Sequence, residues 1–189
     1  MVIAIDLDGV VFDSEEYFRT YSHLYDIALV GNGLRESTEM AVHDRYGWDK
    51  ATANDFYAKY TAKVLEEAPL RPGAKYVLDK LKEMGHTLIC ITLRGHFHEC
   101  EVGITERRVK ELKLPFDKIL YNQKDKLISC KAEGVELIID DNPNTAKLVS
   151  DNGIKCFHFR GAGLRKVEGK NVIEVQNWAD VYEKIIKLN

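Results

Sequence analysis

The sequence predicts an α/β protein: a Rossmann-like, three-layer parallel sheet with a small helical cap inserted after the first strand. Two observations support this fold class. Short apolar runs recur along the chain with helix-like segments between them, which is typical of parallel strands covered on both faces. All but the first of these runs lie beyond residue 85, and residues 15–69 contain no convincing strand.

The expected strands are short, and each is bounded by polar residues. The helix before the second strand can also be predicted, because Pro72 suits the first turn of a helix and Gly85 suits its C-terminal end. Its expected apolar stripe is Ala74, Val77, Leu78, Leu81 and Met84. In chain order the strands are VIAI (2–5), TLICIT (87–92), KILYN (118–122), ELIID (136–140), KCFHF (155–159) and a weaker VIEV (172–175).

The segment from residue 15 to residue 69 is rich in aromatic residues and has helical texture. We therefore expect a core domain of residues 1–14 and 70–189 and a helical cap of residues 15–69. Trp48, Phe56, Phe12 and Tyr17 could stack on a base or cover a sugar, although aromatic residues at helical spacing more often form a core. The expected helices are EEYFRTYSHLYDIAL, STEMAVHDRYGWD and ATANDFYAKYTAKVLEEA.

The bulk properties narrow the function classes. The chain has 189 residues, 45% of them hydrophobic and 30% charged, and a net charge of −3. This balance argues against a nucleic-acid polymer as partner. No signal peptide or membrane-spanning run is visible. The four cysteines form no CxxC pair, which favours reduced thiols and a cytoplasmic protein. The oligomeric state cannot be read from the sequence.

Polar residues gather where the predicted strands end, and ligands of an open parallel sheet bind at that edge. The first strand ends in Asp6 and Asp8, which is a concentration of negative charge that needs a positive counterpart. The other residues at this edge are Thr92, the acidic pair Asp140 and Asp141, and the lysines Lys124 and Lys126.

This set of residues suits phosphoryl chemistry. Several carboxylates at one point favour a hard divalent cation such as Mg²⁺. A carboxylate nucleophile can form an aspartyl-phosphate when lysine, hydroxyl and metal neutralise the phosphoryl oxygens. A second carboxyl two residues on could protonate the leaving oxygen and later activate water. Gly9 would let the chain turn and bring backbone N–H groups towards the phosphate.

The segment DLDGVVFDS resembles the first motif of the haloacid dehalogenase-like (HAD) hydrolases, which has the form DxDGxxxDS. Thr92 after an apolar strand, a lysine in NQKDK and the acidic pair in LIIDDNPNTA follow in the order of the other motifs. The resemblance covers nearly all of the chain outside the cap. ITLRG and the segment ERRVKELKLPFDKILYNQKDK look most like the 5′-nucleotidase branch, which includes deoxyribonucleotidases and uncharacterised bacterial relatives.

The resemblance implies roles for the matched positions. Asp6 would be the nucleophile and also a metal ligand. Asp8 would be the general acid and base, with its backbone carbonyl also on the metal. Thr92 would hydrogen-bond the phosphoryl group, and Lys126 would neutralise charge, with Lys124 the alternative lysine. Asp141 would bind Mg²⁺, and Asp140 would bind it or hold a ligand water. An aspartate at position 8 favours phosphatases over dehalogenases.

The expected function is a Mg²⁺-dependent phosphomonoesterase that acts through an aspartyl-phosphate, specifically a 5′-nucleotidase-like hydrolase of nucleoside monophosphates. A HAD phosphatase for a sugar phosphate is the alternative, because the cap matches the family only in position and helical character. A non-catalytic binding module would be expected to lack Asp6 or the acidic pair, and both are present.

The loop after the second strand carries two further features. Arg94 could bind the substrate phosphate, together with Gly9, Thr92 and Lys126, or pair with an acid. His96, His98 and Cys100 have a spacing that can hold a metal, but no second cluster completes a tetrahedral set. A loop near the active-site mouth is the preferred interpretation of that segment.

Overall fold

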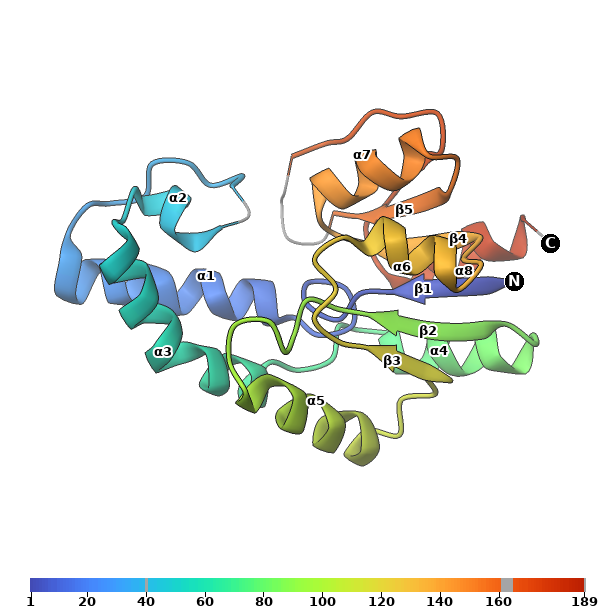
Figure 1. Cartoon of the computed structure of the whole chain (residues 1–189), viewed down its shortest axis with the longest axis horizontal. Helices are drawn as coiled ribbons and strands as arrows, with labels where there is room; N and C mark the ends of the chain where they lie inside the picture. Colours follow the sequence, from blue (N-terminus) through green and yellow to red (C-terminus); the bar gives the residue numbers. More distant parts are fainter. Residues whose placement is uncertain (40, 161–164, 189) are drawn as a thin grey trace.

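The computed structural model describes residues 1–39, 41–160 and 165–188. A six-stranded parallel sheet with the order β3-β2-β1-β4-β5-β6 lies at its centre (Figure 1). The predicted α/β fold is confirmed, including the weak VIEV run, which pairs with β5 as the edge strand. The strands are β1 (Val2–Ile5), β2 (Thr87–Ile91), β3 (Lys118–Leu120), β4 (Leu137–Asp140), β5 (Lys155–Phe159) and β6 (Val172–Val175).

Helices cover both faces of the sheet, because successive residues of a strand point to opposite sides. Ile3 and Ile5 of β1 belong to the core formed with α4 (Ala74–Glu83) and α8 (Trp178–Ile186). Ala4 belongs to the opposite core, formed with α6 (Lys126–Ala132) and α7 (Pro143–Asp151). The three-layer arrangement predicted from the apolar runs is therefore present.

Helix α4 begins later than its proline suggests. Gly73 caps the helix with φ 83°, so Pro72 lies just before the first turn. Ala74, Val77, Leu78 and Leu81 are buried as predicted. Met84 was expected on the same stripe but is 38% exposed, because it is the capping residue at the C-terminal end, where the chain turns away at Gly85.

The segment between β1 and α4 contains no strand among its described residues, as predicted. Its helices are α1 (Ser14–Tyr25), which continues into a π-helical turn η1 (Asp26–Val30), then α2 (Val42–Tyr46) and α3 (Lys50–Glu67). The helix expected over STEMAVHDRYGWD is shorter than predicted, and Met40 lies outside the described residues. These elements extend away from the sheet, and α3 lies beside α5 (Cys100–Glu111) (Figure 1).

The aromatic residues of this segment form a core of their own. Trp48 and Phe56 are 6% and 0% exposed, and they pack with Tyr25, Val42 and Tyr46. Phe12 is also fully buried, in the core of the sheet. The suggestion that Trp48, Phe56 or Phe12 stacks on a substrate is therefore wrong, because no face of these rings is open. Tyr17 is partly exposed.

Two further sequence-based expectations concern membranes and cysteines. None of the helices that the structure describes is long and apolar enough to cross a membrane. All four cysteines are unpaired: Cys90, Cys130 and Cys156 are buried, and Cys100 is exposed.

Candidate active site

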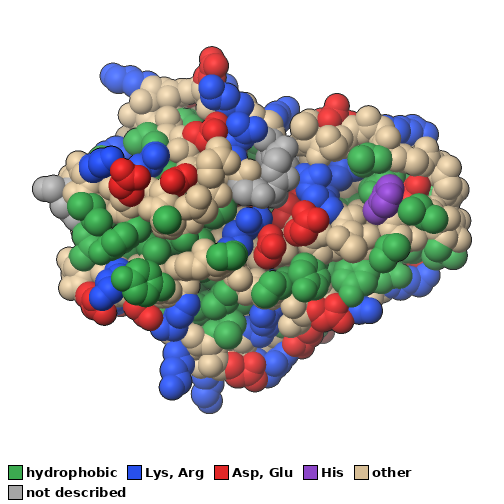
Figure 2. Space-filling model, turned by 180° about the vertical axis from the view of Figure 1, so that it is seen from behind, with side chains coloured by type: hydrophobic (Ala, Val, Ile, Leu, Met, Phe, Trp, Pro, Cys, Tyr) green, Lys and Arg blue, Asp and Glu red, His purple; other side chains and the backbone are tan. Residues whose placement is uncertain are grey.

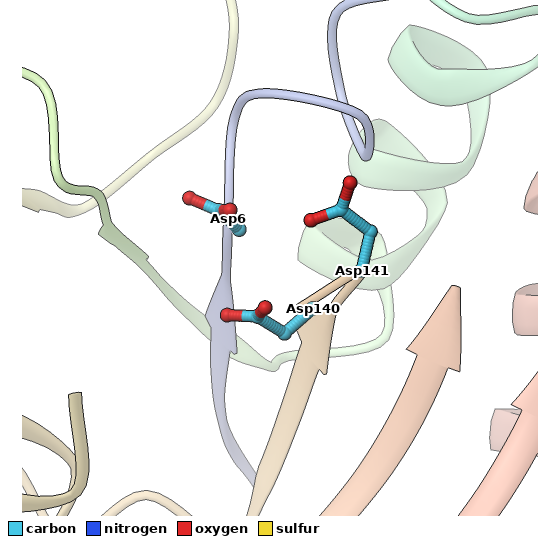
Figure 3. Close-up of side chains that lie close together, drawn as sticks. All are labelled: Asp6, Asp140 and Asp141. Carbon is cyan, nitrogen blue, oxygen red and sulfur yellow. The ribbon is translucent and has the colours of Figure 1, made fainter. Parts of the chain in front are cut away.

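Three carboxyl groups meet at the carboxyl ends of β1 and β4, which are neighbours in the sheet (Figure 3). Asp6 follows β1 directly, Asp140 is the last residue of β4, and Asp141 comes next. One oxygen from each lies within 4.8 Å of the others. Asn142 caps helix α7 by accepting hydrogen bonds from the N–H groups of Asn144 and Thr145. The segment DDNPN therefore both begins this helix and supplies two of the three carboxyl groups.

Lys126 connects two of these carboxylates. Its Nζ lies 2.9 Å from Oδ1 of Asp6 and 2.7 Å from Oδ2 of Asp140. The lysine is the first residue of α6, where the side chain of Asp125 caps the helix, and it is only 7% exposed. Lys124 also lines the cavity described below, but it is exposed and forms no such ion pair with the residues that the structure describes. The geometry therefore favours Lys126 over Lys124 as the charge-neutralising lysine.

The acidic group has more negative charge than Lys126 balances. Burial raises the pKa of Asp6 to about 7, with Asp140 and Asp8 adding to the effect and Lys126 opposing it. Burial and the negative charges of Asp6 and Asp140 raise the pKa of Asp141 well above its usual range. Burial lowers the pKa of Lys126, but the carboxylates of Asp140 and Asp6 outweigh burial and raise it. Hard oxygen donors with uncompensated charge fit a bound Mg²⁺.

Asp8 lies beside this group but has different partners. Arg94 donates two hydrogen bonds to its carboxylate, from Nε at 2.9 Å and from Nη2 at 2.6 Å. Ser14 donates a third, at 2.5 Å. Burial raises the pKa of Asp8, but the charge of Arg94 and these hydrogen bonds outweigh burial and lower it. Ser14 is the last residue of the DLDGVVFDS motif, and its contact with Asp8 was not expected from the sequence.

Gly9 allows a close approach that no other residue permits. Its φ is +74°, and an added Cβ would lie 2.0 Å from Oδ2 of Asp141. Its N–H donates to the carbonyl oxygen of Phe12 at 3.0 Å. The sharp turn expected at Gly9 is therefore present, and phosphate binding by the backbone N–H groups of this turn stays a prediction.

A cavity of about 190 Å³ opens at this edge of the sheet and is lined by Asp6, Asp8, Thr92, Lys126 and Asp141. Residues from four separate segments of the sequence thus reach one space. Thr92 is almost fully buried, and its Oγ1 accepts a hydrogen bond from the N–H of Arg94 at 3.2 Å. Figure 2 shows acidic and basic side chains gathered where the sheet and the helices of residues 15–69 meet.

Two residues lining this cavity were not found from the sequence. Glu15, at the start of α1, lies on its wall and forms ion pairs with Arg19 and Arg45. Gln123 also lines it and accepts a hydrogen bond from Ser129. Glu15 directly follows DLDGVVFDS, and Gln123 lies within NQKDK, so closeness to a motif is the signal that could have found both residues.

In the loop after β2, Arg94 pairs with an acid, which is one of the two roles expected for it. The guanidinium group of Arg94 lies against Asp8 and Thr105 rather than in the space lined by Asp6 and Lys126. Nδ1 of His96 lies 2.6 Å from Oδ1 of Asn122. Among the described residues, the acidic trio is the one group with ligand atoms close enough to hold a metal, so His96, His98 and Cys100 form no such site.

Comparison with known proteins agrees with this geometry. The chain is 24% identical to a nucleotidase from Clostridium acetobutylicum over 188 residues, which is 98% of this chain and 94% of that protein. A crystal structure of a predicted phosphatase from the same organism matches with a TM-score of 0.67 and 17% identity, covering 98% of both chains. A haloacid dehalogenase-like hydrolase from Xanthomonas campestris matches with a TM-score of 0.67 and 13% identity, covering 100% of this chain and 95% of that one. No family model matches the chain.

The fold is that of the HAD hydrolases. The order of DLDGVVFDS and the three later motifs along the chain agrees with this fold and with the resemblance to the HAD hydrolases.

Proposed function

We propose that this chain is a Mg²⁺-dependent phosphomonoesterase that hydrolyses nucleoside monophosphates through an aspartyl-phosphate on Asp6. The observation that carries the proposal is the cavity at the carboxyl ends of β1 and β4. The cavity is lined by the proposed nucleophile Asp6, the acid Asp8, the hydroxyl-bearing Thr92, the buried Lys126 and Asp141 of the acidic pair. Asp140, the other member of that pair, forms an ion pair with Lys126. The nucleotidase of similar length supports the substrate class.

Asp6, Asp141 and the backbone carbonyl of Asp8 would hold Mg²⁺, with Asp140 either binding it or holding a ligand water. The bound ion supplies positive charge that offsets the charge developing on the phosphoryl oxygens. Lys126 and the hydroxyl of Thr92 contribute to the same task from the protein.

In the first step, a carboxylate oxygen of Asp6 attacks phosphorus, and the ester P–O bond breaks. Asp8 gives its proton to the departing alcohol oxygen. In the second step, Asp8 takes a proton from water, the water oxygen attacks phosphorus, and the bond to Asp6 breaks. Inorganic phosphate leaves, and both aspartates return to their starting states.

The pair between Asp8 and Arg94 sets the protonation of this acid. Arg94 favours the ionised carboxylate, which suits the second step, in which Asp8 acts as a base. A substrate phosphate dianion beside Asp8 would raise the pKa of that carboxyl, because like charges disfavour ionisation. Substrate binding therefore prepares Asp8 for the first step.

The experiment is a measurement of phosphate release from nucleoside monophosphates and sugar phosphates, with Mg²⁺ and with EDTA. The proposal predicts Mg²⁺-dependent release with a preference for nucleotides, and none from Asp6→Asn. A preference for sugar phosphates would keep the chemistry and overturn the substrate class. A folded protein with no activity on any ester would overturn the proposal.

A further inference from the structure

A fully buried histidine lies behind the acidic trio. His158 belongs to β5, is 0% exposed and stands opposite Asp140 of β4 in the register of the sheet. Its Nε2 lies 3.1 Å from the backbone carbonyl oxygen of Asp141. Because a carbonyl oxygen only accepts hydrogen bonds, Nε2 must carry the hydrogen and donate it. The contact therefore fixes which nitrogen of the ring is the donor.

The other nitrogen of this ring has no partner. Nδ1 of His158 is buried and forms no hydrogen bond with any residue that the structure describes. A buried polar atom without a partner is costly, and an apolar side chain would avoid that cost. The neighbours Phe157 and Phe159 on the same strand are apolar and buried, as this environment favours. The hydrogen bond to Asp141 is therefore the contact that a histidine gains at this position.

This hydrogen bond holds one end of a peptide group whose other end is also held. The carbonyl of Asp141 and the N–H of Asn142 belong to the same planar peptide group. The carbonyl accepts from His158, and the N–H donates to Oδ1 of Asp140 at 2.8 Å. Two hydrogen bonds at its two ends restrict the rotation of this plane. They therefore also restrict the direction in which the side chain of Asp141 leaves the backbone.

The carboxyl group of Asp141 has little room to change its direction. It points towards the loop after β1 (Figure 3), and an added Cβ at Gly9 of that loop would lie 2.0 Å from its Oδ2. A rotated peptide group would move the carboxylate against this turn or away from the oxygens of Asp6. Mg²⁺ demands near-ideal octahedral geometry, whereas Ca²⁺ accepts flexible sets of ligands. A small rotation would therefore weaken Mg²⁺ binding more than Ca²⁺ binding.

We propose that His158 is a positioning residue for the metal site. Its Nε2–H holds the backbone of Asp141 so that the carboxylate meets the narrow geometry of Mg²⁺. This rests on the part of the proposed function that assigns Asp141 to the metal. It adds a residue of β5 that does not itself bind the ion, and it makes the preference for Mg²⁺ over Ca²⁺ depend on this residue behind the ligands.

The test is isothermal titration calorimetry of the substrate-free protein with Mg²⁺ and with Ca²⁺. His158→Leu keeps a side chain of similar size and removes the donor. The Kd for Mg²⁺ should rise about 10-fold, as is typical when an outer partner of a metal ligand is lost, and the Kd for Ca²⁺ should rise less. His158→Gln can place an amide N–H near the position of Nε2 and should recover most of the Mg²⁺ affinity.

Two further variants guard the comparison. His158→Asn has an amide too short to reach the carbonyl of Asp141, so it should behave like His158→Leu and replaces that variant if the latter does not fold. His86→Leu is the matched control, because His86 is 4% exposed and its Nε2 also lacks a partner among the described residues. His86 directly precedes β2, at the end of the strands opposite the acidic trio, so its replacement should change neither Kd.

An unchanged Kd for Mg²⁺ in the folded variants without the donor, or an equal loss of Mg²⁺ and Ca²⁺ affinity, would overturn the positioning role and leave the proposed function intact. An equal rise of the Mg²⁺ Kd in His158→Gln or in His86→Leu would overturn it as well. A wild-type protein that binds Mg²⁺ but hydrolyses no phosphate ester would overturn the proposed function and not this inference. A wild-type protein that binds no Mg²⁺ would overturn both.

Discussion

Arg94 holds the carboxylate of Asp8 through two hydrogen bonds, of 2.6 and 2.9 Å, and its side chain is almost completely buried. Arg94 comes from the loop after β2, whereas Asp8 comes from the loop after β1. Because the strands are neighbours in the sheet, residues 86 positions apart in sequence form one fixed pair. The guanidinium also lies over the ring of Phe12, which limits its movement.

This pair predicts the effect of replacing Arg94. Arg94→Lys keeps a positive charge but cannot form both hydrogen bonds in the same geometry. We expect kcat to fall by roughly 10- to 100-fold, part of the contribution of a positioned acid, with KM for the substrate little changed. Steady-state kinetics on the best nucleotide would measure both constants. A rise in KM with unchanged kcat would instead mean that Arg94 binds the substrate phosphate directly.

Lys126 and Lys124 should respond very differently to the same substitution. Lys126→Met leaves Asp6 and Asp140 without their shared cation, and breaking a buried pair costs about 3–5 kcal/mol of unfolding free energy. Lys124→Met changes an exposed side chain and should cost less than about 0.5 kcal/mol. Urea unfolding and phosphate release would compare the two variants. If Lys124→Met abolished activity and Lys126→Met did not, the assignment of the lysine would be reversed.

Gly9 should be required for metal binding as well as for the turn. In Gly9→Ala the new Cβ would displace the carboxylate of Asp141, so we expect a weaker response to Mg²⁺ in addition to lower stability. Gly134→Ala is the matched control, since Gly134 also has a positive φ but nothing lies within 4 Å of its added Cβ. The Mg²⁺ concentration that gives half-maximal activity should rise for the first variant and stay constant for the second.

The acidic cluster predicts how stability depends on pH. The pKa of Asp6 is raised to about 7 in the folded protein, so folding favours its neutral form. The stability that this carboxyl contributes is fully present below its unfolded pKa and is lost as pH rises towards 7. In EDTA, the Tm should therefore fall between pH 5 and pH 8. Mg²⁺ binds the ionised carboxylates, so its stabilising effect should be larger at pH 8.

Asp6→Asn is the control for this pH dependence, because an amide does not titrate. In EDTA, the Tm of this variant should fall less between pH 5 and pH 8 than that of the wild-type protein. The remaining fall in Tm would come from Asp141, whose pKa is also raised. Equal stabilisation by Mg²⁺ at pH 5 and pH 8 would contradict the assignment of these carboxylates as the metal ligands.

Much of this site was predictable from the sequence because it depends on strand ends. Parallel strands of one sheet bring their carboxyl ends together, so Asp6, Thr92 and Asp140 could be placed at one edge from the sequence alone. The relation that the sequence left open depends on side-chain direction. Arg94 could bind phosphate or pair with an acid, and in the structure it pairs with Asp8. No periodicity in the sequence encodes that choice.

The cap illustrates the same limit. Its helices were predictable from composition, but which aromatic residues are buried depends on how those helices pack. Trp48 and Phe56 fill the core among the cap helices, whereas Phe18 and Tyr57 line a smaller cavity beside Asp8. All four are aromatic residues in one segment, so residue type alone could not separate the rings of the core from those that line a cavity.

The most direct test of the account is to trap the phosphorylated enzyme. The protein would be mixed with its best substrate and Mg²⁺, quenched within milliseconds and treated with borohydride, which reduces an aspartyl-phosphate to homoserine. Mass spectrometry of the peptide containing residues 2–14 should then find homoserine at position 6 and none in Asp6→Asn. An unmodified Asp6 during active turnover, or homoserine at another aspartate, would contradict the assignment of Asp6 as the nucleophile.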